Sequence, residues 1–261
     1  MQTLVLLHGV ASNSTRWAEF AESTHLRGWK ILRPDLRGNA AAALPRTRLG
    51  MDVWCADLAA LLDAERCENA VIGGHCLGAN IALQFAARYP RRAAALVLIE
   101  PMPPDALAGS AAWLPSLKFL LYGIYGFARA ANACGIYRRR LEPLDLREWD
   151  RATRAGERQL TMLASLGVDL AATPIAAYTR MLAATAEAWP EVTAIRAPAL
   201  ALMSSRSSMT EPGRTRRALG ALPDCEIVEL DAVHWIPTEQ PDAMRAAIEG
   251  WLNRRGPGRA P

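Results

Sequence analysis

The chain has 261 residues, of which 51% are hydrophobic and 21% are charged, and its formal net charge is +4. These values argue against a disordered chain, a collagen-like chain and a long coiled coil, and the length suits one α/β domain or one domain with an insertion. The arginines are scattered and form no continuous basic stripe with aromatic residues, so the sequence does not indicate nucleic-acid binding.

Short apolar runs alternate with helix-length segments along most of the chain. Nearly continuous apolar runs are typical of parallel strands that are buried on both faces. Strands that alternate with helices predict βαβ units and a doubly wound, mostly parallel sheet of about six strands. The predicted strands are residues 3–7, 30–33, 70–72, 94–99, 199–203 and 226–230, and the predicted helices are residues 51–65, 79–88, 211–219 and 241–252.

The alternation stops between Pro101 and Arg196, where no clear strand pattern is present. Leucines and aromatic residues in this stretch predict helices that fold over something apolar. We therefore predict a helical cap at residues 101–195, inserted into a core made of residues 1–100 and 196–261. The cap aromatics Trp113, Phe119 and Tyr122 are candidates to bind the apolar part of a substrate, although they could also fill the cap's own interior.

The most informative segment is Gly74-His75-Cys76-Leu77-Gly78, which lies between an apolar run and a predicted helix. A sharp strand-to-helix turn requires small residues two positions before and after its centre, and the two glycines meet this requirement. The turn would place Cys76 at the N-terminus of a helix, where the helix dipole and free N–H groups favour an anion. Free cysteine is by default a small apolar side chain, but these flanking residues favour a thiolate nucleophile.

Three further motifs accompany this segment, in the order Leu6-Leu7-His8-Gly9, Pro34-Asp35-Leu36-Arg37-Gly38 and His234-Trp235-Ile236-Pro237. With them, the chain resembles the α/β-hydrolase family over nearly its whole length. The family's usual cap position coincides with the gap described above. By this resemblance the chain would begin at the family's third strand, so that the first two strands are absent.

The resemblance implies a nucleophile at Cys76 and a general base at His234, with an oxyanion hole formed by the backbone N–H groups of Leu77 and Val10. Two preorganised donors that face a developing oxyanion each accelerate such reactions by roughly 10²–10³. Trp235, beside the base, is a further candidate for substrate contact.

The chain departs from the usual pattern because Cys76 stands where most members have serine. Dienelactone hydrolases and polyhydroxyalkanoate synthases resemble it in this respect. A thiol needs less activation than a hydroxyl, and a thioester intermediate is also open to attack by amines and thiols.

The acid that orients the histidine is the second departure. The loop at residues 203–208, where the family usually has Asp, contains no carboxylate. Glu100 stands at an alternative family position, at the end of the preceding predicted strand, and we predict that it orients His234. A site without an acid, or one that uses Asp231 or Glu211, remains open.

Together these features predict a hydrolase of carboxylic esters or thioesters that needs no cofactor or metal and acts on a small molecule with a hydrophobic acyl portion. An acyltransferase or cyclase on the same scaffold is the alternative, and a catalytically degenerate binding protein is the third reading. A haloalkane dehalogenase or epoxide hydrolase is disfavoured because Cys76 replaces the Asp nucleophile of those enzymes.

The cysteine pattern and the apolar stretches bear on the cellular setting. The five cysteines form neither a CxxC pair nor a Cys/His ligand spacing, which indicates a reducing, cytoplasmic setting without disulfides or zinc. The longest apolar stretch, at residues 106–133, is interrupted by proline, glycine and charged residues, so we expect no stable membrane span. The sequence leaves the oligomeric state open.

Overall fold

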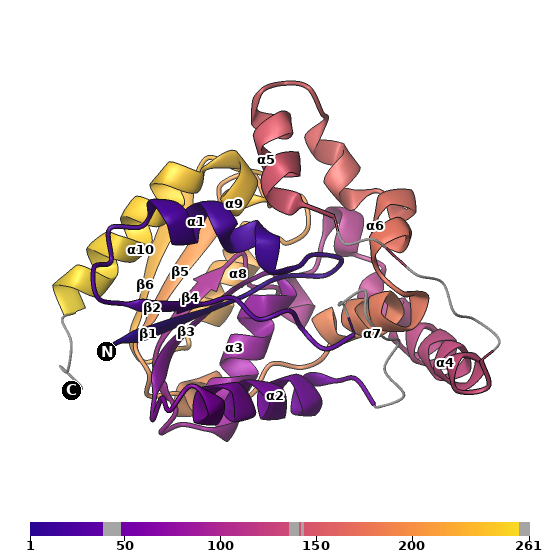
Figure 1. The fold of residues 1–261 in the computed structure, drawn as a ribbon, viewed down its shortest axis with the longest axis horizontal. Coiled ribbons are helices and arrows are strands. Elements are labelled where there is room, and N and C mark those ends of the chain that lie inside the picture. Colours follow the sequence, from indigo (N-terminus) through magenta and orange to yellow (C-terminus); the bar gives the residue numbers. More distant parts are fainter. Residues whose placement is uncertain (39–47, 136–140, 142–143, 256–261) are drawn as a thin grey trace.

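The structure, a computed structural model, describes residues 1–38, 48–135, 141 and 144–255. At the centre of this described part is a six-stranded parallel sheet with the strand order β2-β1-β3-β4-β5-β6 (Figure 1). The strands are β1 (Thr3–Leu7), β2 (Lys30–Leu32), β3 (Ala70–His75), β4 (Ala93–Ile99), β5 (Ala199–Ser204) and β6 (Cys225–Leu230). The predicted doubly wound α/β sheet is therefore confirmed.

Both faces of the sheet are covered, which explains why its central strands are continuously apolar. Successive strand residues point to opposite faces. In β1, Leu4 and Leu6 pack in one cluster with Trp251, whereas Val5 and Leu7 pack in the cluster on the other face. The edge strands β2 and β6 are only half-buried for most of their length.

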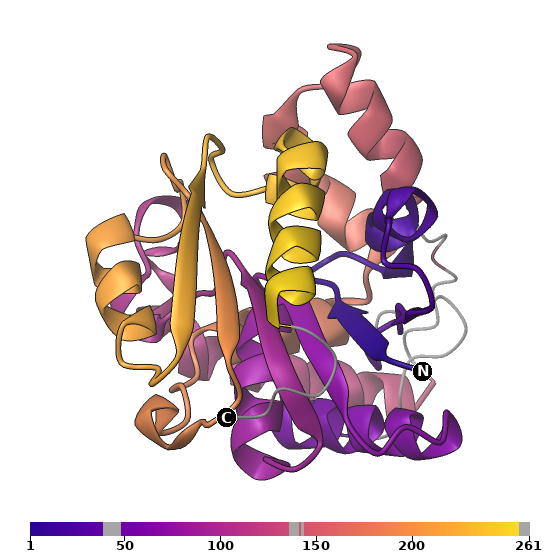
Figure 2. The same ribbon diagram turned by 90° about the vertical axis from the view of Figure 1, so that its left-hand side faces the viewer.

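Two layers of helices provide this cover (Figures 1 and 2). Figure 2 shows α10 lying along the strands. The layer on one face consists of α1 (Ala18–Ser23) and α10 (Pro241–Arg255), and the layer on the other face consists of α2 (Met51–Ala64), α3 (Leu77–Arg88) and α8 (Pro212–Leu219).

All four predicted helices are present, with shifted ends. Helix α3 begins at Leu77, two residues before the predicted start, and α10 continues to Arg255. The short helices α1 and α9 (Ile236–Glu239) were not predicted. Six and four residues span less than two turns, too few for a helical period to show in the sequence.

The segment between β4 and β5 contains four α-helices and, among its described residues, no β-strand. These inserted helices lie beyond the carboxyl ends of the strands (Figure 1). Helix α4 packs along α7, and α7 also contacts α3. The division of the chain into a core and a cap with bounds at 101 and 195 stays a prediction. The inserted helices are α4 (Leu114–Ala133), α5 (Leu146–Arg154), α6 (Leu166–Ala172) and α7 (Ile175–Thr185).

A buried ion pair attaches α5 to the rest of the molecule. Arg16, in the 3-10 turn Ser14–Trp17, pairs with Asp150, and the hydroxyl of Thr238 also donates to Asp150, at 2.8 Å. Among the described residues, no helix has both the length and the apolar composition needed to cross a membrane. In the same part of the chain, no three His, Cys, Asp or Glu side chains cluster in a way that could hold a metal ion.

Candidate active site

Cys76 occupies the turn between β3 and α3, with φ +56° and ψ −117°. This strained conformation is rare for a residue with a side chain. The turn brings the backbone so close to its neighbours that a Cβ on Gly74 would overlap the backbone of Gly78, and a Cβ on Gly78 would overlap the backbone of Leu7. The two glycines that the sequence singled out are therefore required by the packing of this turn.

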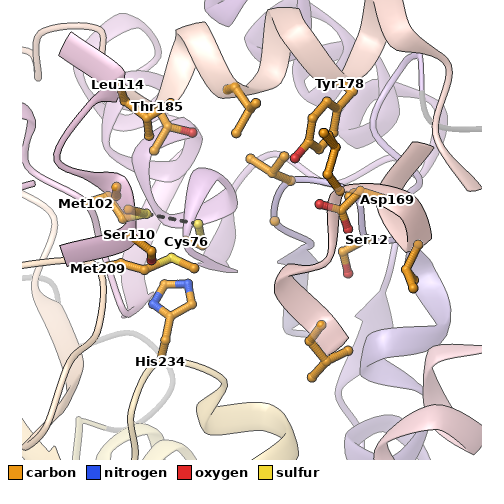
Figure 3. A pocket seen from close by; sticks show the side chains of 18 of the residues that line it. Ser12, Cys76, Met102, Ser110, Leu114, Asp169, Tyr178, Thr185, Met209 and His234 are labelled. Atoms are coloured by element: carbon orange, nitrogen blue, oxygen red, sulfur yellow. Dashed lines mark hydrogen bonds between the residues drawn. The ribbon is translucent and has the colours of Figure 1, made fainter. Parts of the chain in front are cut away.

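The turn leaves the thiol at the first turn of α3, 7% exposed, facing a cavity. Its Sγ donates to Sδ of Met102 at 3.1 Å (Figure 3). The backbone N–H of Cys76 donates to the carbonyl of Ile99 at 2.9 Å, which ties the turn to the end of β4. Cys76 is therefore nearly buried and forms part of the cavity wall.

His234 lies in the loop after β6, and its ring points toward Cys76 (Figure 3). One carboxylate holds this loop: Glu239 accepts hydrogen bonds from the backbone N–H groups of Val233, His234 and Trp235, at 2.9 to 3.2 Å. His75 adds a further contact, because its Nε2 donates to the carbonyl of His234 at 3.0 Å.

Glu100 directly follows β4 and has φ +48°. Its side chain is 4% exposed, and Oε2 lies 3.1 Å from Nδ1 of His234. The backbone N–H of Ser204 donates to Oε1, and the hydroxyl of Ser207 donates to Oε2 at 3.2 Å. These bonds fix the carboxylate and leave the other ring nitrogen of His234 for Cys76.

The alternative acids have other partners. Asp231 is largely exposed and pairs with Arg206 at 2.8 Å. Glu211 accepts from the backbone N–H groups of Gly213 and Arg214 and so caps the N-terminus of α8. The structure therefore brings Glu100, and neither of these two, to the imidazole.

The pKa values of the two neighbouring buried histidines, His234 and His75, are shifted in opposite directions. Burial by itself would lower the pKa of His234, but hydrogen bonds with Cys76 and Glu100, and their negative charges, outweigh it and raise the pKa to about 10. Burial lowers the pKa of His75 well below its ordinary value, and the charge of His234 lowers it further. A charged imidazole at position 234, beside a neutral one at position 75, is the state favoured near neutral pH.

The loop after β1 forms the neighbouring wall. Burial lowers the pKa of His8 to about 4, so this ring is neutral. Its Nδ1 donates to the carbonyl of Gly9 at 2.9 Å, and its Nε2 accepts from the backbone N–H of Leu36 at the same distance. These bonds hold the loop against the Cys76 turn: a Cβ on Gly9 would lie 3.3 Å from that of Cys76. Val10 lines the cavity, and Leu77 begins α3.

The cavity beside Cys76 has a volume of about 520 Å³ and is lined mainly by apolar side chains of the core and of the inserted helices. Trp113 and Trp235 line it, as the sequence suggested. Phe119 and Tyr122 are absent from the lining formed by the described residues, so their part in substrate binding stays a prediction. Phe119 is 78% exposed because it faces away from the buried side of α4, and the hydroxyl of Tyr122 instead donates to Glu187 at 2.6 Å.

Several residues of the site escaped sequence reasoning. Met102 follows Glu100 by two positions, and Glu239 lies five residues after His234. Their closeness in sequence to predicted site residues could have identified them as further candidates for the site. Asp169 and Tyr178 line the side of the cavity away from Cys76 (Figure 3), and no motif marks them.

The chain is similar to known proteins in sequence and in fold. The family model described as the alpha/beta hydrolase fold matches residues 2–241. Lipase LipV of Mycobacterium tuberculosis is 36% identical over 100 residues, which cover 38% of this chain and 36% of that protein. The 2-hydroxy-6-oxo-2,4-heptadienoate hydrolase of Pseudomonas putida is 32% identical over 102 residues, covering 37% and 36% of the two chains. An uncharacterized protein of Mycobacterium bovis is 30% identical over 97 residues, covering 37% and 28%.

The matched stretches thus span about a third of the length of these curated relatives. Solved structures match over almost the whole chain, at lower identity. A hydrolase from Pseudomonas aeruginosa has a TM-score of 0.71 at 21% identity, covering 96% of this chain and 89% of that one. The enol-lactonase from Burkholderia xenovorans has a TM-score of 0.68 at 22% identity, covering 97% and 91%. At these identities the structures establish a shared fold.

Proposed function

Because the chain belongs to the alpha/beta hydrolase fold family, we propose that it hydrolyses carboxylic esters or thioesters through a covalent acyl-thioester on Cys76. One observation carries this proposal: the thiol, the imidazole of His234 and the carboxylate of Glu100 form a connected line at the wall of an apolar cavity. Such cavities suit substrates that are mostly hydrophobic, with few polar groups.

In the proposed acylation step, the proton of the thiol resides on Nε2 of His234. Sγ of Cys76 forms a bond to the acyl carbon, and the carbonyl oxygen becomes an oxyanion that the N–H groups of Leu77 and Val10 would stabilise. The bond to the leaving group then breaks, and the leaving group takes the proton from His234. The raised pKa of His234 supports a protonated imidazole that can give its proton to the leaving group.

Deacylation needs His234 in the opposite state. Once the sulfur is acylated it carries no negative charge, so one of the two partners that raise the pKa of His234 is lost. The imidazole can then accept a proton from water while the water oxygen attacks the thioester carbon. The C–S bond breaks, the acid leaves, and the proton returns to the Cys76–His234 pair.

The test uses p-nitrophenyl butyrate. Intact-mass analysis after rapid quenching should detect one butyryl group on Cys76, and Cys76→Ala should lower kcat/KM by about 10³-fold or more because the intermediate cannot form. Cys134→Ala is the matched control, since this cysteine is exposed and outside the cavity lining. Full turnover by Cys76→Ala would refute the proposal, and added amine acceptors would distinguish free acid from acyl transfer.

A further inference from the structure

The cavity has a second polar position, away from Cys76 and His234. Asp169, on α6, and Tyr178, on α7, lie together on this far side (Figure 3). The hydroxyl of Tyr178 donates to the carboxylate of Asp169. Both residues come from the inserted helices, so this position is built separately from the reactive end of the cavity.

Asp169 is half-buried in mainly apolar surroundings, with the side chain of Ser12 beside it (Figure 3). The same two helices also contribute Leu166, Leu170 and Ile175 to the cavity lining, of which Leu166 and Ile175 are partly open to solvent. Burial raises the pKa of Asp169 to about 6, with the bond from Tyr178 acting against this. At neutral pH the side chain is therefore largely ionised, at a position where solvent reaches it only in part.

No cation pairs with Asp169 among the described residues. The arginine that the described lining contributes, Arg16, is already bound to Asp150 and Thr238. A partly buried anion in mainly apolar surroundings gains most from a partner that carries a positive charge. A hydroxyl could bond to the carboxylate but would leave its charge uncompensated, whereas an ammonium group supplies both the hydrogen bond and the opposite charge.

We propose that Asp169 and Tyr178 form a subsite for a protonated primary amine, carried at the far end of an otherwise apolar substrate. The carboxylate accepts the hydrogen bonds of the ammonium group, and the hydroxyl of Tyr178 keeps it oriented toward the cavity. The assignment rests on the proposed function, since it places the reacting carbonyl at Cys76 and the amine at the opposite end of the same molecule.

Binding tests the subsite without turnover. Isothermal titration should give n-hexylammonium an affinity about 10-fold higher for the wild type than for Asp169→Asn, since the variant loses a hydrogen bond between charged groups. Tyr178→Phe should weaken binding less, by about 3-fold, because the carboxylate remains. Asp242→Asn is the matched control, an exposed carboxylate on α10 outside the cavity lining. Equal affinities of the wild type and Asp169→Asn, or an equal loss in Asp242→Asn, would overturn the proposal.

Turnover separates this inference from the function on which it rests. The substrates are p-nitrophenyl esters of ω-amino acids, with chains of about four to eight carbons, and of the matching unsubstituted acids. Asp169→Asn should lower the ratio of kcat/KM between the amino and plain esters about 10-fold at the preferred chain length. If both series are hydrolysed and the ratio does not change, the subsite is refuted while the proposed function stands. If neither series is hydrolysed, the proposed function fails, and the titration alone decides the subsite.

Discussion

Glu100 connects His234 to the protein backbone. Its two oxygens together accept from Ser204, Ser207 and His234, so the carboxylate is held in place before any substrate binds. A fixed carboxylate that binds one ring nitrogen of a histidine sets both the tautomer and the basicity of the imidazole. The effect of Glu100 on His234 should therefore be measurable apart from any effect on folding.

Glu100→Gln tests this link. The amide keeps the size of the side chain but removes the negative charge that helps to raise the pKa of His234 to about 10, so that pKa should fall. We expect kcat/KM for an ester substrate to drop by about 10- to 100-fold. NMR titration of the imidazole and the pH–rate profile measure the two effects. Ser207→Ala is the control, since it removes one hydrogen bond and no charge; an unchanged His234 pKa in Glu100→Gln would contradict the link.

Some residues of the candidate site could be predicted from the sequence alone. Cys76 could be predicted as the nucleophile because a strained turn requires small residues close by in the sequence. Glu100 was a candidate through its place at a strand end. The sequence could not show whether Phe119 or Asp169 lines the cavity. Which face of a helix meets the cavity depends on how the inserted helices pack. The catalytic roles of the selected residues remain predictions.

At the scale of elements, the β3–α3 turn combines tight packing with a strained cysteine. Gly78 is buried at the start of α3, where any Cβ would overlap the backbone of Leu7 and His8. Gly123 lies within α4, exposed, with nothing near the position of a Cβ. Gly78 and Gly123 therefore predict opposite effects for the same substitution.

Gly78→Ala should destabilise the protein by about 3 kcal/mol, because backbone atoms must move apart in a closely packed turn. Gly123→Ala should stabilise it by about 0.5–1 kcal/mol, because alanine loses less conformational entropy in a helix. Urea unfolding followed by circular dichroism measures both variants. Equal effects would mean that the turn relaxes around the added methyl group.

The elements themselves were largely predictable, for a physical reason. A strand buried on both faces must be apolar throughout, and runs such as Ala94 to Ile99 are visible without a structure. The start of α3 was predicted late, because Leu77 and Gly78 belong to the turn as much as to the helix. Short helices such as α1 gave no periodic signal.

At the scale of the whole molecule, β1 has β2 on one side and β3 on the other, so the order in which strands are added to the sheet changes direction beside the site. In open α/β sheets, ligands bind at the carboxyl ends of the strands beside such a reversal. Cys76 follows β3, Glu100 follows β4 and His234 follows β6, so three segments distant in sequence meet at that edge. The same convergence buries His8, His75 and His234 together, which connects the site to the stability of the fold.

These histidines predict a stability maximum in the middle of the pH range. Burial holds the pKa of His8 at about 4 and lowers that of His75, so below about pH 6.5 the unfolded chain binds more protons than the folded chain. Stability is then lost as the pH falls from about 6.5 toward 4, by about 3 kcal/mol from His8 over that interval. His234 acts in the opposite range, because its raised pKa gives stability that is complete below pH 6.5 and is lost as the pH rises toward 10.

Urea unfolding near pH 4, 6.5 and 10 measures the two limbs of this curve. The acid limb should also reflect the bond that the neutral His8 accepts from the backbone of Leu36, which a protonated ring cannot accept. In Glu100→Gln the alkaline loss should shrink, because the pKa of His234 then lies closer to its unfolded value, while the acid loss stays as in the wild type. An alkaline limb that is the same in both proteins would show that the charge on His234 does not depend on Glu100, and the proposed role of Glu100 would lose its main support.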